Sequence, residues 1–108
     1  MRTVLLLTRD QFGDGDADLG RKVLGTFLRK CVALEGLEAV LFVNHGARLV
    51  AADSPVLAEL HLLEERGVEL VPCGTCLEHY GIEPQVGEVG TMDAIVRELS
   101  RAEKVVSP

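Results

Sequence analysis

Long hydrophobic runs are missing from this sequence. A segment that crosses a bilayer needs roughly 20 consecutive apolar residues, whereas the longest runs here are short stretches such as 4–7 and 39–43. The first residues also lack the extended apolar stretch and small-residue cleavage site of a secretory signal. We therefore expect no membrane association and a cytoplasmic location.

Positive charge is scarce. The chain has 11 Lys and Arg against 17 Asp and Glu, which gives a net charge of −6. The basic residues are scattered, so the sequence lacks the basic patch that a nucleic-acid-binding protein presents to phosphates. We expect no nucleic acid among the partners.

Cysteine is scarce too, with three residues in the chain. Three thiols in a cytoplasmic protein do not form a disulfide framework, and in a reducing compartment they favour redox, sulfur-transfer or metal chemistry. Cys31 falls on the apolar stripe of a predicted helix, so we expect it to be a small buried core residue. Cys73 and Cys76 are then the thiols left for chemistry.

The 108 residues are predicted to form a single domain, residues 1–108, with an α/β fold. Short apolar runs alternate with amphipathic segments, a pattern typical of parallel strands joined by helices. We expect a three-layer α/β/α arrangement with a mostly parallel five-stranded sheet. The expected strands are 3–8, 37–43, 68–71, 86–89 and 104–107, and the expected helices are 19–31, 54–66, a short one within 73–80, and one capped by Thr91.

In such sheets, ligands bind beyond the carboxyl ends of the strands. This rule selects three loops, residues 9–18, 44–53 and 73–80. The first loop is rich in Gly and Asp, but Asp18 replaces the third glycine of a dinucleotide-binding fingerprint, and its carboxylates would repel a pyrophosphate. We expect an acidic turn there and no cofactor.

The second loop places an amide, an imidazole and a guanidinium at the end of a strand, in Asn44, His45 and Arg48. If this loop faces the thiols, His45 is a candidate base or thiolate partner, and Arg48 is a candidate ligand for a sulfur-bearing anion.

The third loop contains the sequence Cys73-Gly74-Thr75-Cys76 directly after a predicted strand. The spacing brings two sulfurs close enough to form a disulfide or to pass sulfur between them, and Gly74 permits a tight turn. A helix beginning here would place free backbone N–H groups beside the thiols. We expect these groups to lower the pKa of both cysteines.

Other chemistry at this loop stays open. Cys73, Cys76 and His79 have the spacing of three zinc ligands, with His45 as a fourth from a neighbouring loop. A dithiol oxidoreductase and a purely structural or scaffolding pair are further alternatives, although the strand–helix order does not match a thioredoxin. Our preferred interpretation includes no metal.

The whole chain resembles the DsrE-like sulfur-relay family, and within it the carboxyl-terminal domain of the YedF-type proteins associated with selenium metabolism. None of the stretches that carry this resemblance is specific for the family alone, but together they are. They are residues 4–8, 12–15, 41–44, 63–67, 71–77, 86–89 and 104–106. In this chain His45 stands where relatives often have glycine.

The resemblance implies a homo-oligomer that carries a persulfide on cysteine and hands the sulfur, or selenium, to a partner protein. Members with one cysteine have it where Cys73 stands, so the resemblance assigns sulfur acceptance to Cys73 and a resolving or second-carrier role to Cys76. The chain would then act as a sulfurtransferase-like carrier between donor and acceptor proteins, with Gly74, Thr75, Asn44, His45 and Arg48 in support.

Overall fold

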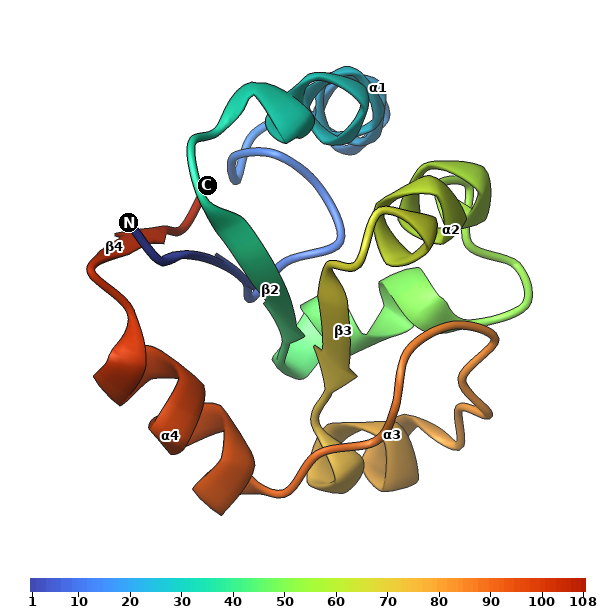
Figure 1. Cartoon of the computed structure of the whole chain (residues 1–108). Helices are drawn as coiled ribbons and strands as arrows, with labels where there is room; N and C mark the ends of the chain where they lie inside the picture. The colour runs from blue at the N-terminus through green and yellow to red at the C-terminus, as the bar shows by residue number, and fades with distance from the viewer.

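Four parallel strands form the sheet of the computed structural model, which describes residues 1–108 (Figure 1). The strand order is β3-β2-β1-β4. The strands are β1 (Thr3–Leu7), β2 (Leu37–Phe42), β3 (Glu69–Pro72) and β4 (Lys104–Val106). The helices are α1 (Ala17–Lys30), α2 (Leu57–Glu65), α3 (Gly74–Tyr80), α4 (Met92–Arg101) and two 3₁₀ helices, η1 (Cys31–Ala33) and η2 (Asn44–Val50).

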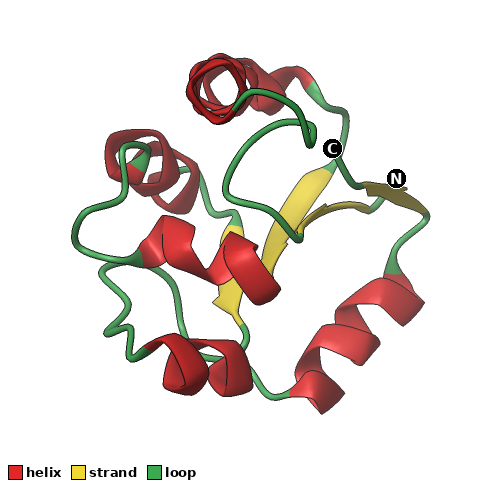
Figure 2. Ribbon diagram, turned by 180° about the vertical axis from the view of Figure 1, so that it is seen from behind, coloured by secondary structure: helices red, strands yellow, loops and turns green.

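The helices cover both faces of the sheet. α1 and α2 lie on one face and α4 lies on the other, as the views from front and behind show (Figures 1 and 2). The chain moves from β1 to β2 to β3 in one direction and then returns across the sheet to β4. Because parallel crossovers are right-handed, this reversal moves the connecting helix to the opposite face. The expected three-layer α/β/α arrangement is confirmed.

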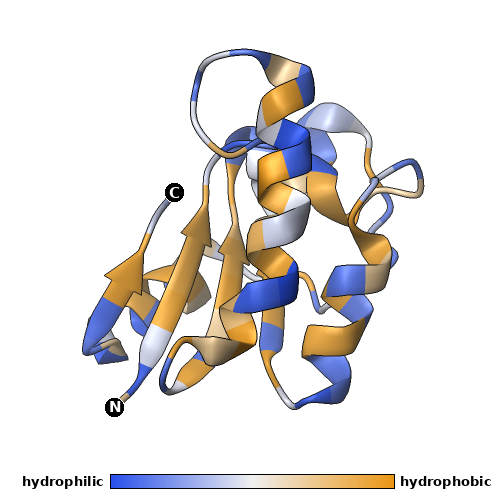
Figure 3. Cartoon of the chain, turned by 90° about the horizontal axis from the view of Figure 1, so that it is seen from above, coloured by the Kyte–Doolittle hydropathy of each residue, from blue (hydrophilic) through white to orange (hydrophobic).

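The strands are apolar along most of their length (Figure 3). They separate two buried clusters, one on each face of the sheet. The larger cluster includes Leu5, Phe42 and Leu60 and lies beneath α1, α2 and η2, whereas the smaller includes Leu41, Cys73 and Ile95 and lies beneath α4. Cys31 is buried in the larger cluster, as expected. None of the helices combines the length and the apolar character that spanning a bilayer requires.

The predicted fifth strand at residues 86–89 is wrong. Gly87 has a left-handed backbone (φ 76°), which interrupts an extended conformation, and only Gly90 forms a parallel bridge, with Cys73. The segment nevertheless follows the outer edge of β3, because the N–H groups of Glu88 and Gly90 donate to the carbonyls of Leu70 and Pro72. It therefore covers an edge strand without becoming one.

Two predicted helices differ from the structure in detail. The apolar face expected for α1 also included Leu19 and Val23, which are 59% and 38% exposed, whereas Leu24, Leu28 and Cys31 are buried as expected. The loop before the helix packs onto Gly20, where a Cβ would lie 2.8 Å from that of Gln11.

The second helix, α2, begins later than the predicted Ser54 cap. The hydroxyl of Ser54 accepts a hydrogen bond from the N–H of Val56 and so closes a turn that precedes the helix. The predicted cap of α4 is confirmed, since the Thr91 hydroxyl accepts from the N–H of Ala94.

The helix η2 is fixed to the end of β1 by the close approach of two backbones. A Cβ on Gly46 would lie 2.0 Å from the carbonyl oxygen of Leu7, so no other residue fits without displacing one segment. The N–H of Val43 donates to the same carbonyl at 3.0 Å. These contacts set the position of residues 44–48 at the edge of the sheet.

We expect Gly46→Ala to lower the free energy of unfolding by about 1–3 kcal/mol, the usual effect of overpacking a filled site. Urea denaturation measures the change as a lower midpoint with an unchanged m value. Gly15→Ala is the matched control, because a Cβ at Gly15 has nothing within 4 Å. Equal midpoints for the two variants would contradict this account.

Candidate functional site

Cys73 and Cys76 lie where β3 leaves the sheet. The ladder between β2 and β3 continues one residue past the strands, because the N–H of Cys73 donates to the carbonyl of Phe42 at 2.9 Å. This bond holds Cys73 in the smaller core cluster, where it is 2% exposed. Cys76 follows in the first turn of α3 and is half-buried, with contacts to both clusters.

The backbone of Asn44 faces the second thiol. Its N–H donates to the sulfur of Cys76 at 3.1 Å. Asn44 has φ 52°, the only left-handed conformation outside glycine in the chain. Asparagine tolerates this region better than most residues do. The predicted proximity of the loop 44–53 to the thiols is thus confirmed at Asn44, through a main-chain group.

The environment of Cys76 disfavours its thiolate. Burial raises the pKa of this thiol, the N–H of Asn44 lowers it, and the hydrogen bond and charge interaction with Cys73 raise it again. The net direction is upward. The prediction that backbone N–H groups lower the pKa is therefore wrong for Cys76, since desolvation outweighs the one N–H that reaches the sulfur.

Gly74 and Thr75 separate the two cysteines. The N–H of Gly74 donates to the carbonyl of Gly90 at 3.0 Å, and a Cβ at Gly74 would lie 3.1 Å from Val89. A side chain at position 74 would crowd residues 89–90, which glycine lets approach closely. Thr75 is exposed on the outer side of the helix turn.

Tyr80, the single tyrosine of the chain, lies between Cys76 and the loop 44–53. It was not among the site residues predicted from the sequence. Its hydroxyl donates to the side-chain oxygen of Asn44 at 2.9 Å, and its ring lies 4.7 Å from the guanidinium of Arg48. The rings of His45 and His79 also pack against it. The spacing in the sequence could have indicated this residue, because Tyr80 follows Cys76 by four residues and therefore lies on the same side of α3.

The structure brings His45 and Arg48 to Tyr80 rather than to a sulfur. His45 is exposed, with its ring centre 5.9 Å from that of Tyr80. Neither side chain forms a hydrogen bond with Cys73 or Cys76. No group of three or more His, Cys, Asp or Glu side chains is placed to hold a metal ion, so the ligand set of the zinc alternative is not assembled.

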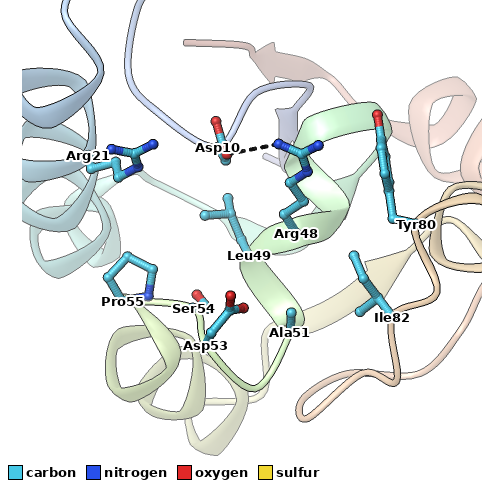
Figure 4. A pocket seen from close by; sticks show the side chains of 10 residues that line it. All are labelled: Asp10, Arg21, Arg48, Leu49, Ala51, Asp53, Ser54, Pro55, Tyr80 and Ile82. Atoms are coloured by element: carbon cyan, nitrogen blue, oxygen red, sulfur yellow. Dashed lines mark ion pairs between the residues drawn. The ribbon is translucent and has the colours of Figure 1, made fainter.

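A cavity of about 440 Å³ lies beside this group of residues (Figure 4). Arg48 and Tyr80 form one side and Arg21 lies on the other; Asp10 lies between the two arginines, and Asp53 lies beside Ser54. Arg48 approaches Asp10 at 3.8 Å. The cavity therefore presents two cations and two anions at the carboxyl end of the sheet.

Comparison with known proteins supports the fold. The ychN protein from E. coli is similar in structure over 100% of both chains, with a TM-score of 0.71 and 15% identity. MTH1491 from Methanobacterium thermoautotrophicum, a protein of unknown function, covers 99% of this chain and 98% of its own, with a TM-score of 0.74 and 20% identity.

BT1422 from Bacteroides thetaiotaomicron, a conserved protein of unknown function, gives a TM-score of 0.68 at 18% identity, over 98% of this chain and 94% of its own. No protein-family model matches the sequence, and neither does any curated protein. The chain therefore has a DsrE/YchN-like fold, with four strands rather than the five expected.

The raised pKa of Cys76 predicts a slow thiol at neutral pH. We expect its alkylation by iodoacetamide to rise with pH to a midpoint above that of a free cysteine, about 8.5. Cys73→Ala removes one of the causes that raise the pKa of Cys76, so the midpoint should fall toward that of a free cysteine. Burial of Cys76 should still keep the midpoint above that value. Peptide mass spectrometry after timed labelling follows Cys76 alone. A wild-type midpoint at or below 8.5 would contradict the prediction.

Proposed function

We propose that this protein is a sulfurtransferase-like carrier that holds sulfane sulfur, or selenium, as a persulfide on the loop 73–76 and passes it to a partner protein. The observation that carries the proposal is the thiol pair at the carboxyl edge of a parallel sheet, with Cys76 half-exposed and Cys73 beside it. The DsrE/YchN-like fold agrees with this function, and the persulfide chemistry is what the sequence resemblance implies.

The burial of the two thiols favours one order of transfer. Cys73 is almost fully buried, whereas Cys76 is the cysteine that solvent reaches. In this proposal Cys76 is the first acceptor and Cys73 is the second thiol, the reverse of the order that the resemblance implies.

The proposed reaction conserves atoms and electrons. The Cys76 thiolate attacks the terminal sulfur of a donor persulfide, a new sulfur–sulfur bond forms, and the donor thiolate leaves. The sulfur then moves to an acceptor thiol by the same step. Alternatively, the Cys73 thiolate attacks the Sγ atom of Cys76, which gives a Cys73–Cys76 disulfide and releases hydrosulfide.

The supporting residues act on Cys76 in this proposal. The N–H of Asn44 stabilises the negative sulfur of a thiolate or persulfide, and Tyr80 holds Asn44 in place. Gly74 lets residues 89–90 pack against the loop, and Thr75 flanks the exposed side of the thiol. His45 and Arg48 contribute through their contacts with Tyr80.

The partners in this proposal are sulfur donors, acceptor proteins and further copies of the chain. The homo-oligomer is implied by the family resemblance, and an apolar stripe on the outer side of α2 is in keeping with it. The stripe comprises Pro55, Ala58 and Leu62, all exposed.

One alternative draws support from the same geometry. The side chains of Cys73 and Cys76 interact, as a dithiol oxidoreductase requires. That function predicts a reversible disulfide with no bound sulfur.

Intact-protein mass spectrometry after exposure to inorganic polysulfide tests the carrier. We expect wild-type protein to gain the mass of one sulfur and Cys76→Ser to gain none. Cys73→Ser should load sulfur but release no hydrosulfide. Cys31→Ser is the matched control and should load like wild type, because Cys31 is buried away from the loop.

Loading that depends on Cys73 and not on Cys76 would restore the order implied by the family. Unchanged loading in the Cys73→Ser/Cys76→Ser double variant would contradict the carrier. A loss of two hydrogens in the wild type, together with no sulfur loaded by Cys73→Ser, would favour the oxidoreductase.

A further inference from the structure

The cavity beside Tyr80 is lined by side chains of both charges, and this arrangement favours one class of ligand. Arg21 and Arg48 face it together with Asp10 and Asp53. An inorganic anion would meet two carboxylates there, and a simple cation would meet two guanidinium groups. A ligand that carries both an ammonium and a carboxylate matches both pairs.

Two of these side chains have unused binding capacity. The Arg48 side chain is about half-exposed and forms no hydrogen bond, and its one ion pair, with Asp10, is long at 3.8 Å. Its guanidinium is oriented by the Tyr80 ring at 4.7 Å, which leaves its donors free for a carboxylate. Asp53 has no hydrogen bond or ion pair and is free to accept from an ammonium group.

The cavity and the thiol are within the span of one small molecule. Tyr80 lines the cavity and is one helical turn from Cys76, a separation of about 5–6 Å between Cβ atoms. An extended tripeptide covers about 10 Å. The cavity volume of about 440 Å³ is in the usual range for small-ligand sites. A cysteinyl peptide held at Arg48 and Asp53 can therefore extend its sulfur past Tyr80 to Cys76.

We infer that this cavity binds the persulfide of a small zwitterionic cysteinyl peptide, which donates its terminal sulfur to Cys76. This inference rests on the proposed carrier function and identifies the chemical class of the carrier's sulfur donor. The Cys76 thiolate attacks the terminal sulfur, the sulfur–sulfur bond of the peptide breaks, and the peptide leaves as a thiolate that takes up a proton. No oxidant or reductant is consumed.

Tyrosine fluorescence reports on this cavity alone, because Tyr80 is the single tyrosine and the chain has no tryptophan. Titration with S-methylglutathione, an unreactive zwitterionic peptide, should change this fluorescence and saturate. We expect Arg48→Gln and Asp53→Asn each to weaken binding about tenfold, the usual effect of losing a charged hydrogen bond. Lys104→Gln, which removes a cation at the far edge of the sheet, should bind like wild type.

A loading assay separates this inference from the function on which it rests. S-methylglutathione should inhibit sulfur transfer from glutathione persulfide to Cys76 and should not inhibit loading by inorganic polysulfide. If polysulfide loads Cys76 but the analogue neither binds nor competes, the cavity is not the donor site and the carrier function stands. If the analogue binds but no donor loads the protein, the carrier function is overturned instead.

Discussion

The arrangement of the site depends on the hydrogen-bond ladder between β2 and β3, which continues beyond the strands. The pairing of Phe42 with Pro72 and the bond from the N–H of Cys73 to the Phe42 carbonyl fix where β3 ends relative to β2. Parallel strands bring their carboxyl ends to one edge. Cys76, three residues later, consequently meets Asn44, two residues after Phe42. A shift of register by one residue would turn the thiols to the opposite faces.

The left-handed backbone conformation of Asn44 is locally strained, and it directs the N–H of Asn44 toward the sulfur of Cys76. Such a conformation is disfavoured for residues other than glycine and persists where the surrounding structure holds it. Here Gly46 is fixed against the Leu7 carbonyl on one side, and Tyr80 binds the Asn44 side chain on the other. The strained residue directs its N–H at a sulfur whose pKa burial has raised. A thiol of this kind is protonated at rest, yet its thiolate is intrinsically more nucleophilic than one of low pKa.

The sequence predicted the layers of the fold because apolar periodicity reflects burial directly. The prediction failed where glycines decide the backbone conformation: Gly87 interrupts the strand expected at 86–89, which instead covers the edge of β3, and Gly20 lets the preceding loop pack on α1. Cys73 and Cys76 could be selected from their spacing after a strand. Tyr80 could not, because its importance comes from contacts with Asn44 and Arg48, which lie more than 30 residues earlier in the chain.

The two thiols differ in environment, and in the proposed carrier this difference sets the direction of sulfur transfer. Cys73 belongs to the core beneath α4, whereas Cys76 lies between the two clusters and faces the loop that carries Asn44. Cys76 is partly exposed and Cys73 is almost fully buried, so in the proposed carrier a donor reaches Cys76 and sulfur arrives at this thiol first. Once a persulfide forms on Cys76, the neighbouring Cys73 is shielded from solvent thiols and is the nucleophile already in place. In this proposal the burial of Cys76 slows the first step, and the deeper burial of Cys73 protects the second step from competing thiols.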